Sequence, residues 1–204
     1  MSKKALLFIN GEAPKQLPEI DDFQLIACTD GAFHYLRERK FPLDKIDFIS
    51  GDFDSFLMQD EFREKRIHTP DQNKTDFHKA LEIIVEKGGA EVSVYGASGK
   101  EQDHFLGNLH TAYLFKNQLD ICFYDEFASY FFAENHTILN NVKGKMISLI
   151  PFPEAKNIYT KGLHWVLNGG NLSLTERIGT RNRADEDVVE IEYKEGALVL
   201  FVEN

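Results

Sequence analysis

Short apolar runs alternate with helical periodicity through the first two-thirds of the chain. The apolar runs predict buried strands at residues 5–9, 25–28, 46–49, 92–95 and 119–124 and near Ile67. Periodic segments between them predict helices over residues 31–40, 58–64, 75–87 and 104–116. The last of these helices is expected to turn inward the side chains of Leu106, Leu109, Tyr113, Phe105 and Ala112. Strands that alternate with helices predict an α/β fold with a mostly parallel sheet and helices on its faces.

The pattern changes near residue 130, where runs become shorter and turn residues more frequent. Asparagine and glycine cluster at residues 140–144 and 168–171. Farther on, Val189, Ile191 and Tyr193 alternate with charged residues, which is typical of a half-exposed antiparallel strand. We therefore expect two domains, an α/β domain over residues 1–130 and a C-terminal antiparallel β-sandwich over residues 131–204.

Composition limits the classes of ligand. The 204 residues carry 33 acidic and 23 basic side chains, a formal net charge of −10. Such a chain is a poor binder of nucleic acid or of an anionic membrane, and a polyphosphate ligand would need a metal cation as mediator. No apolar run approaches the ~20 residues of a membrane span. Cys28 and Cys122 lie in apolar runs and are expected to be buried thiols, which fits a reducing, cytoplasmic compartment.

Acidic residues follow four successive predicted strands. Because the carboxyl ends of parallel strands meet at one edge of the sheet, we expect these side chains to converge there. Each aspartate alone is also a common turn or helix-capping residue, so the prediction depends on their coincidence. The residues concerned are Asp30, Asp52, Asp54, Asp71, Asp76 and Asp103.

Carboxylates gathered in this way predict a divalent-cation site. Mg²⁺ prefers hard oxygen ligands and commonly joins one or two carboxylates to substrate phosphates. A shared dication would also explain how Asp52 and Asp54 can lie side by side. Gly31 and Gly51 lack a Cβ and so allow close approach of a ligand, and a glycine-rich loop at residues 96–99 precedes the 104–116 helix.

The order of these motifs resembles that of the thiamine pyrophosphokinase family. The motifs are DG at residue 30, GDFDS at 51–55, TPDQ with TDF at 69–77, a glycine-rich loop ending in DH at 96–104, GLxW at 162–165, and Asn182. The resemblance implies an α/β catalytic domain that binds nucleotide and metal, and a β-sandwich that binds thiamine and forms a homodimer with active sites between subunits. It also implies the reaction of ATP with thiamine to give thiamine diphosphate and AMP.

The resemblance assigns roles to individual residues. Asp52, Asp54 and Asp76 correspond to the Mg²⁺ ligands. Asp103 lies near metal and phosphates, and either it or Asp71 is a candidate to accept the proton of the thiamine hydroxyl. The thiamine is expected to lie between Gln72 and Trp165, with Asn182 contacting its pyrimidine region. The residues expected on the nucleotide side are Asp30, Gly31, Ser50, Gly51, Gly96, Gly99 and Lys100.

Three positions depart from the family pattern. Glu101 stands where the family loop carries an arginine, which removes a charge-assisted donor that Lys100 could replace. Arg181 replaces a serine before Asn182, and the TDGAFH motif differs on the nucleotide side. Two other hypotheses therefore stay open, a non-catalytic regulator that binds thiamine or nucleotide, and a phosphohydrolase that uses Asp52 as its nucleophile.

Overall fold

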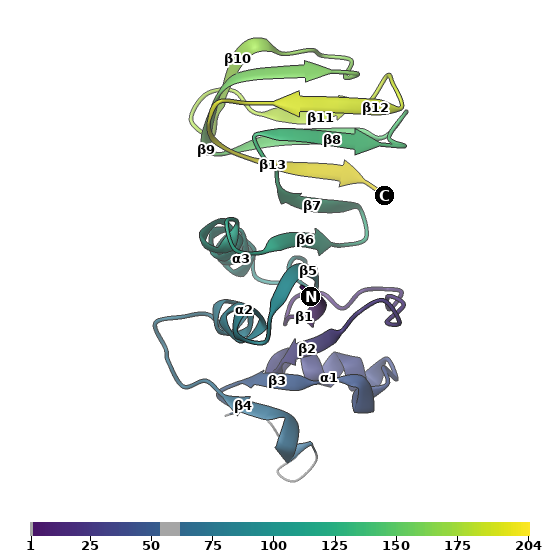
Figure 1. Cartoon of the computed structure of the whole chain (residues 1–204), viewed down its shortest axis with the longest axis vertical. Coiled ribbons are helices and arrows are strands. Elements are labelled where there is room, and N and C mark those ends of the chain that lie inside the picture. Colours follow the sequence, from purple (N-terminus) through teal and green to yellow (C-terminus); the bar gives the residue numbers. More distant parts are fainter. Residues whose placement is uncertain (1, 54–61) are drawn as a thin grey trace. The chain divides into compact units, whose positions relative to one another are not determined.

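A computed structural model describes residues 2–53 and 62–204 of the chain, which divide into two compact units after Glu126. Asp54 and residues 58–61 of a predicted helix lie outside the described residues. Each unit has its own secondary-structure class, helices on a parallel sheet in the first and antiparallel strands in the second. The expected α/β class is confirmed, with parallel strands followed by antiparallel ones (Figure 1).

The described part of the first unit contains a parallel sheet in the order β4-β3-β2-β1-β5-β6. Its central strands are buried on both faces, which explains why they read as uninterrupted apolar runs in the sequence. The strands are β1 (Lys3–Phe8), β2 (Leu25–Thr29), β3 (Phe48–Gly51), β4 (Arg66–His68), β5 (Gly89–Tyr95) and β6 (Asp120–Tyr124).

Helices cover both faces of this sheet. Even-numbered residues of β1 and β2, such as Phe8 and Cys28, pack with Leu36 of α1 in one core. Helix α2 contacts β2, β3 and β5 and packs beside α3. Thr75 caps the N-terminus of α2, since its hydroxyl accepts a hydrogen bond from His78 N at 3.2 Å. The helices are α1 (Asp30–Glu38), α2 (Asp76–Glu86) and α3 (Gln102–Phe115), with 3₁₀ turns at Leu43–Lys45 and Arg63–Lys65.

The predicted inward face of α3 is partly wrong. Leu109 and Ala112 are buried, but Leu106 is 61% exposed and Tyr113 is 37% exposed. Apolar residues surround more than one side of this helix, so periodicity in the sequence could not select the side that packs against α2. The correction matters for the site, because the side of α3 that carries Gly107 and Asn108 lines a cavity.

The second unit is an antiparallel sheet organised by one long strand, β9 (Met146–Lys161). Different parts of β9 pair with β10, β11, β12 and β13, so strands on several sides enclose one core around Ile147, Leu149 and Ile158. The other strands are β7 (Ala128–Phe132), β8 (His136–Asn140), β10 (Asn168–Ser173), β11 (Gly179–Arg183), β12 (Val188–Glu192) and β13 (Glu195–Glu203). Among the described residues, no helix combines the length and apolar character that a membrane crossing requires.

Candidate active site

The strand order places a crevice between β1 and β5. After β1 the chain adds β2, β3 and β4 on one side, whereas β6 lies on the other side of β5, so loops leave these two neighbours in opposite directions. Open α/β sheets bind ligands at such a switch point, outside the carboxyl ends of the strands. The two loops also contact each other, because Gly11 N donates to Gly96 O at 2.6 Å. Gly96 has φ +79°, and a Cβ there would lie 2.3 Å from Ile9 O, so this approach requires glycine.

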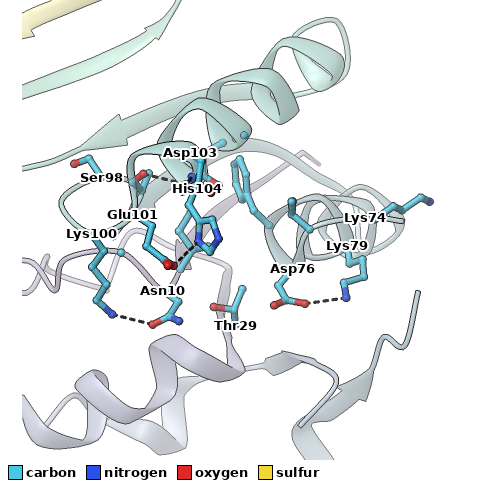
Figure 2. A pocket seen from close by; sticks show the side chains of 18 of the residues that line it. Asn10, Thr29, Lys74, Asp76, Lys79, Ser98, Lys100, Glu101, Asp103 and His104 are labelled. Atoms are coloured by element: carbon cyan, nitrogen blue, oxygen red, sulfur yellow. Dashed lines mark hydrogen bonds and ion pairs between the residues drawn. The ribbon is translucent and has the colours of Figure 1, made fainter. Parts of the chain in front are cut away.

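A cavity of about 470 Å³ lies at this edge of the sheet. Its size is within the ~300–1,000 Å³ typical of small-molecule sites. Figure 2 shows side chains from the loop after β1, the end of β2, the first turn of α2 and the glycine-rich loop around one hollow. The structure brings together six residues that the sequence singled out, which are Asp52, Gln72, Asp76, Gly96, Lys100 and Asp103.

Other residues that the sequence singled out do not line the described wall of the cavity. Asp30 and Ser50 are buried, at 8% and 0% exposure. Gly31, Gly51, Asp71 and Gly99 are likewise absent from that wall. Trp165 and Asn182 belong to the second unit. Their proposed roles remain predictions, but a direct substrate contact is best supported for the six residues that line the cavity.

Charges of both signs face the cavity. Asp52, Asp76, Glu101 and Asp103 supply carboxylates, and Lys100 supplies a cation. Lys74 and Lys79 also belong to the wall, but their ammonium groups pair with Glu82 at 2.6 Å and with Asp76 at 2.8 Å. Hard oxygen donors of this kind are the ligands that Mg²⁺ prefers, so the donor set fits a divalent cation, and the ammonium group of Lys100 fits a phosphate oxygen. The hydroxyl oxygen of Thr29 is buried in the same wall and has no hydrogen-bond partner among the described residues, as expected of a group whose partner is a ligand.

Sequence reasoning missed Lys79. Its side chain is only 7% exposed, and its ammonium group donates to Thr69 O at 2.8 Å and to Asp71 O at 3.4 Å. It also forms an ion pair of 2.8 Å with Asp76 Oδ1, drawn in Figure 2. The lysine thus ties the loop that carries Gln72 to the first turn of α2 and orients the Asp76 carboxylate. The i, i+3 spacing of Asp76 and Lys79 was the one feature of the sequence that indicated their ion pair.

In the glycine-rich loop, Lys100 and Glu101 make different contacts. Lys100 Nζ donates to Asn10 Oδ1 at 3.0 Å, which connects the loop after β5 to the loop after β1. Glu101 Oε2 lies 3.5 Å from His104 Nδ1, and its side chain is 74% exposed. The cation at position 100 therefore lies in the cavity wall beside the departure, as the sequence hypothesis required for a substitute donor.

Asp30 is buried and lies within electrostatic reach of two cavity residues, Asp52 and Asp76. Burial raises the pKa of its carboxyl group, partly offset by hydrogen bonds from the backbone N–H groups of Phe53 and Gly31, and the negative charges of Asp76 and Asp52 raise it further. Its oxygens accept from Gly31 N at 2.7 Å and from Phe53 N at 3.1 Å. Because this buried carboxylate accepts the backbone N–H of Phe53, it is bonded directly to the loop after β3.

The second unit carries a smaller hollow of about 120 Å³ beside Trp165. The indole is 59% exposed, and Asn182 holds its backbone: Trp165 N donates to Asn182 Oδ1 at 3.0 Å, and Asn182 Nδ2 donates to Trp165 O at 2.8 Å. Arg183 N donates to the same Oδ1 at 2.9 Å. The side-chain amide of Asn182 thus holds the backbone of Trp165 and Arg183 through three hydrogen bonds.

Together, the fold and the cavity define an α/β ligand-binding protein whose acidic site lies at a sheet switch point, joined to an antiparallel β unit. Two family models match the chain in this order. Residues 18–123 match the model described as "Thiamin pyrophosphokinase, catalytic domain", and residues 135–198 match "Thiamin pyrophosphokinase, vitamin B1 binding domain". The chain therefore belongs to the thiamine pyrophosphokinase family.

Individual relatives agree with this family. The chain is 29% identical to "Thiamine pyrophosphokinase 3" of Oryza sativa subsp. japonica over 90% of its own length and 80% of that protein. It is 26% identical to the Bacillus subtilis thiamine pyrophosphokinase over 74% of the chain and 75% of that protein. The crystal structure of a Bacillus subtilis thiamine pyrophosphokinase matches with a TM-score of 0.83 at 20% identity, over 99% of each chain. The yeast structure has a TM-score of 0.81 at 18% identity, over 99% of this chain and 86% of that one. At these identities the structural matches support the fold.

Proposed function

We propose that the protein transfers the pyrophosphoryl group of ATP to the hydroxyl of thiamine, giving thiamine diphosphate and AMP, with Mg²⁺ as cofactor. The observation that carries the proposal is the convergence of Asp52, Gln72, Asp76 and Asp103 on one cavity in a member of this family. Bound Mg²⁺ would supply charge neutralisation on the phosphates of ATP. Asp52 and Asp76 are the described residues that would hold it, and Asp54 completes the set in the sequence.

The chain's own residues would position the two substrates. Lys100 would place an ammonium group at the cavity for phosphate oxygens, and Gln72 would offer an amide to one face of thiamine. In-line attack of the thiamine hydroxyl on the β-phosphorus then depends on alignment more than on a covalent intermediate, and such alignment can supply ~7–11 kcal/mol of the barrier.

Asp103 is the better supported proton acceptor. It lines the cavity, whereas Asp71 does not line the described wall. In addition, Asn73 donates its backbone N–H to Asp71 Oδ1 at 2.9 Å and its side-chain N–H at 3.0 Å. These bonds lower the pKa of the Asp71 carboxyl group and weaken it as a base.

The finer features of the proposal come from the family resemblance. We propose that residues 1–130 act as the catalytic domain and residues 131–204 as the thiamine-binding and dimerisation domain. In a cytoplasmic homodimer, the indole of Trp165 would then cover the thiamine bound by the partner subunit. The exposed, backbone-clamped indole supports this role, since a rigid aromatic face suits a cationic thiazolium.

One assay tests the function. Purified protein incubated with ATP, MgCl₂ and thiamine is expected to release AMP and thiamine diphosphate in equal amounts, measured by chromatography. Thiamine binding without AMP release would instead support the regulator hypothesis. Release of phosphate from a phosphomonoester through a phospho-aspartate would support the phosphohydrolase.

Replacing Trp165 by alanine is expected to raise the KM for thiamine about 2- to 30-fold, with a smaller change in the KM for ATP. The range follows from the ~0.5–2 kcal/mol of a cation–π contact with tryptophan. Initial rates at varied thiamine concentration measure it. Val166→Ala is the matched control because Val166 is the neighbouring residue and is also 59% exposed. Equal KM values in the Trp165 variant and the wild type would remove Trp165 from the thiamine site.

A further inference from the structure

The carboxylate of Asp30 does not line the described cavity wall and is bonded to the backbone of a neighbouring loop. Asp30 opens α1 directly after β2, and its side chain is enclosed rather than exposed at the cavity wall. Oδ2 accepts the N–H of Phe53 at 3.1 Å, and Oδ1 accepts that of Gly31 at 2.7 Å. One buried side chain thus connects the end of β2 with the residue that follows Asp52.

The loop after β3 has an unusual conformation at the point that Asp30 holds. Phe53 has φ +61°, a left-handed conformation that costs a non-glycine residue free energy and that surrounding contacts must sustain. Just before it, Gly51 lies against the Asp30 carboxylate, and a Cβ at position 51 would come within 2.3 Å of Asp30 Oδ2. The space at Gly51 and the hydrogen bond at Phe53 therefore bracket Asp52 from both sides, and both involve the same carboxylate.

We infer that Asp30 is a positioning residue for Asp52: its buried carboxylate fixes the backbone on both sides of Asp52 and thereby aims the Asp52 side chain into the cavity. The inference rests on the proposed function for what Asp52 binds, a divalent cation with a polyphosphate. It changes the role of Asp30 from the nucleotide contact that the family resemblance suggests to an internal support. Replacing a residue whose hydrogen bonds hold a metal ligand in place commonly changes metal affinity or activity by ~10- to 100-fold.

Asp30→Asn tests the inference because it keeps the shape of the side chain. An asparagine can satisfy Gly31 N or Phe53 N with its one oxygen, and its NH₂ group then faces the other backbone donor. We expect the Kd for Mn²⁺, measured by electron paramagnetic resonance on the protein with a non-hydrolysable ATP analogue, to rise about 10-fold or more. The Mg²⁺ concentration for half-maximal turnover should rise in parallel, while the KM for thiamine stays within about twofold.

Asp47→Asn is the matched control. Asp47 Oδ2 accepts the backbone N–H of Ile26 at 2.7 Å, so it makes the same kind of bond between β2 and the approach to β3, away from the cavity. Both variants are expected to lower the melting temperature, but Asp47→Asn should leave the Kd for Mn²⁺ unchanged. A wild-type Mn²⁺ affinity in folded Asp30→Asn would overturn the inference, as would an equal loss of affinity in the control.

A second variant decides the question where Asp30→Asn does not fold. Gly51→Ala keeps every charge and pushes a methyl group toward the Asp30 carboxylate, so it should weaken Mn²⁺ binding in the same way. Unchanged Mn²⁺ affinity in folded Gly51→Ala would also contradict the inference. These outcomes are separate from the proposed function, since wild-type protein that binds Mn²⁺ and nucleotide but releases no AMP would reject the reaction and leave the role of Asp30 intact.

Discussion

Replacing Asp52 or Asp76 by asparagine is expected to lower the rate of thiamine-dependent AMP release by roughly 10²–10³-fold or more. Both side chains line the cavity, Asp52 from the loop after β3 and Asp76 from the first turn of α2, and their convergence is the basis of the proposed cation site. Asparagine keeps the shape and one oxygen but removes the negative charge that a divalent cation requires. Initial rates at saturating ATP and thiamine measure the loss, with circular dichroism to show that each variant stays folded.

The Mg²⁺ dependence separates loss of a metal ligand from loss of a general acid or base. Raising the Mg²⁺ concentration should restore part of the activity of the Asp52 and Asp76 variants if the lost group was a ligand. Asp44→Asn is a suitable control, because it removes the same charge from a turn outside the cavity wall. Wild-type turnover in both the Asp52→Asn and Asp76→Asn proteins would reject the metal-site proposal.

The sequence was sufficient to predict the helices and strands whose buried residues recur with a regular spacing or form an unbroken apolar run. The 75–87 segment has one apolar face and becomes α2, and the uninterrupted apolar runs become the buried strands of a parallel sheet. Parallel topology explains why the sequence alone assigns Asp52, Asp76 and Asp103 to one edge, since that edge collects the loops at the carboxyl ends of the strands.

What the sequence did not predict depends on contacts between distant residues. The side of α3 that packs inward is chosen by its neighbours, because Leu106 and Leu109 are equally apolar in sequence. Lys100 meets Asn10 across 90 residues, and neither residue signals the other. The motif placed Asp30 at a turn on the nucleotide side, but no pattern in the sequence indicates that its carboxylate accepts a hydrogen bond from Phe53 N, 23 residues later.

Lys79 is the clearest missed residue, and its replacement is expected to have a large effect on stability. A lysine within an amphipathic helix is ordinarily expected at the surface with its charge in water. Here the ammonium group is enclosed and satisfies two backbone carbonyl groups and one carboxylate, with acceptors eight and ten residues earlier in the chain and three residues earlier on α2. Only the fold brings those acceptors to one point.

Lys79→Met is expected to lower the free energy of unfolding by about 2–3 kcal/mol, because it removes charge-assisted hydrogen bonds and leaves their acceptors without a donor. The value is below that of a fully buried ion pair because Asp76 is 45% exposed and can be hydrated. Urea denaturation measures the change. With a typical slope of the free energy of unfolding against urea concentration, it corresponds to a decrease in the unfolding midpoint of about 1 M.

Lys87→Met is the matched control for this prediction, since it removes the same charge from the end of the same helix, outside the cavity wall. The folded Lys79→Met protein should also turn over more slowly, because Asp76 and the loop that carries Gln72 lose their common anchor. Equal midpoints for the Lys79 and Lys87 variants would show that the buried ammonium does not hold this loop in place. A stability loss confined to Lys79→Met, together with reduced turnover, would show that one side chain both stabilises the first turn of α2 and orients the acidic rim.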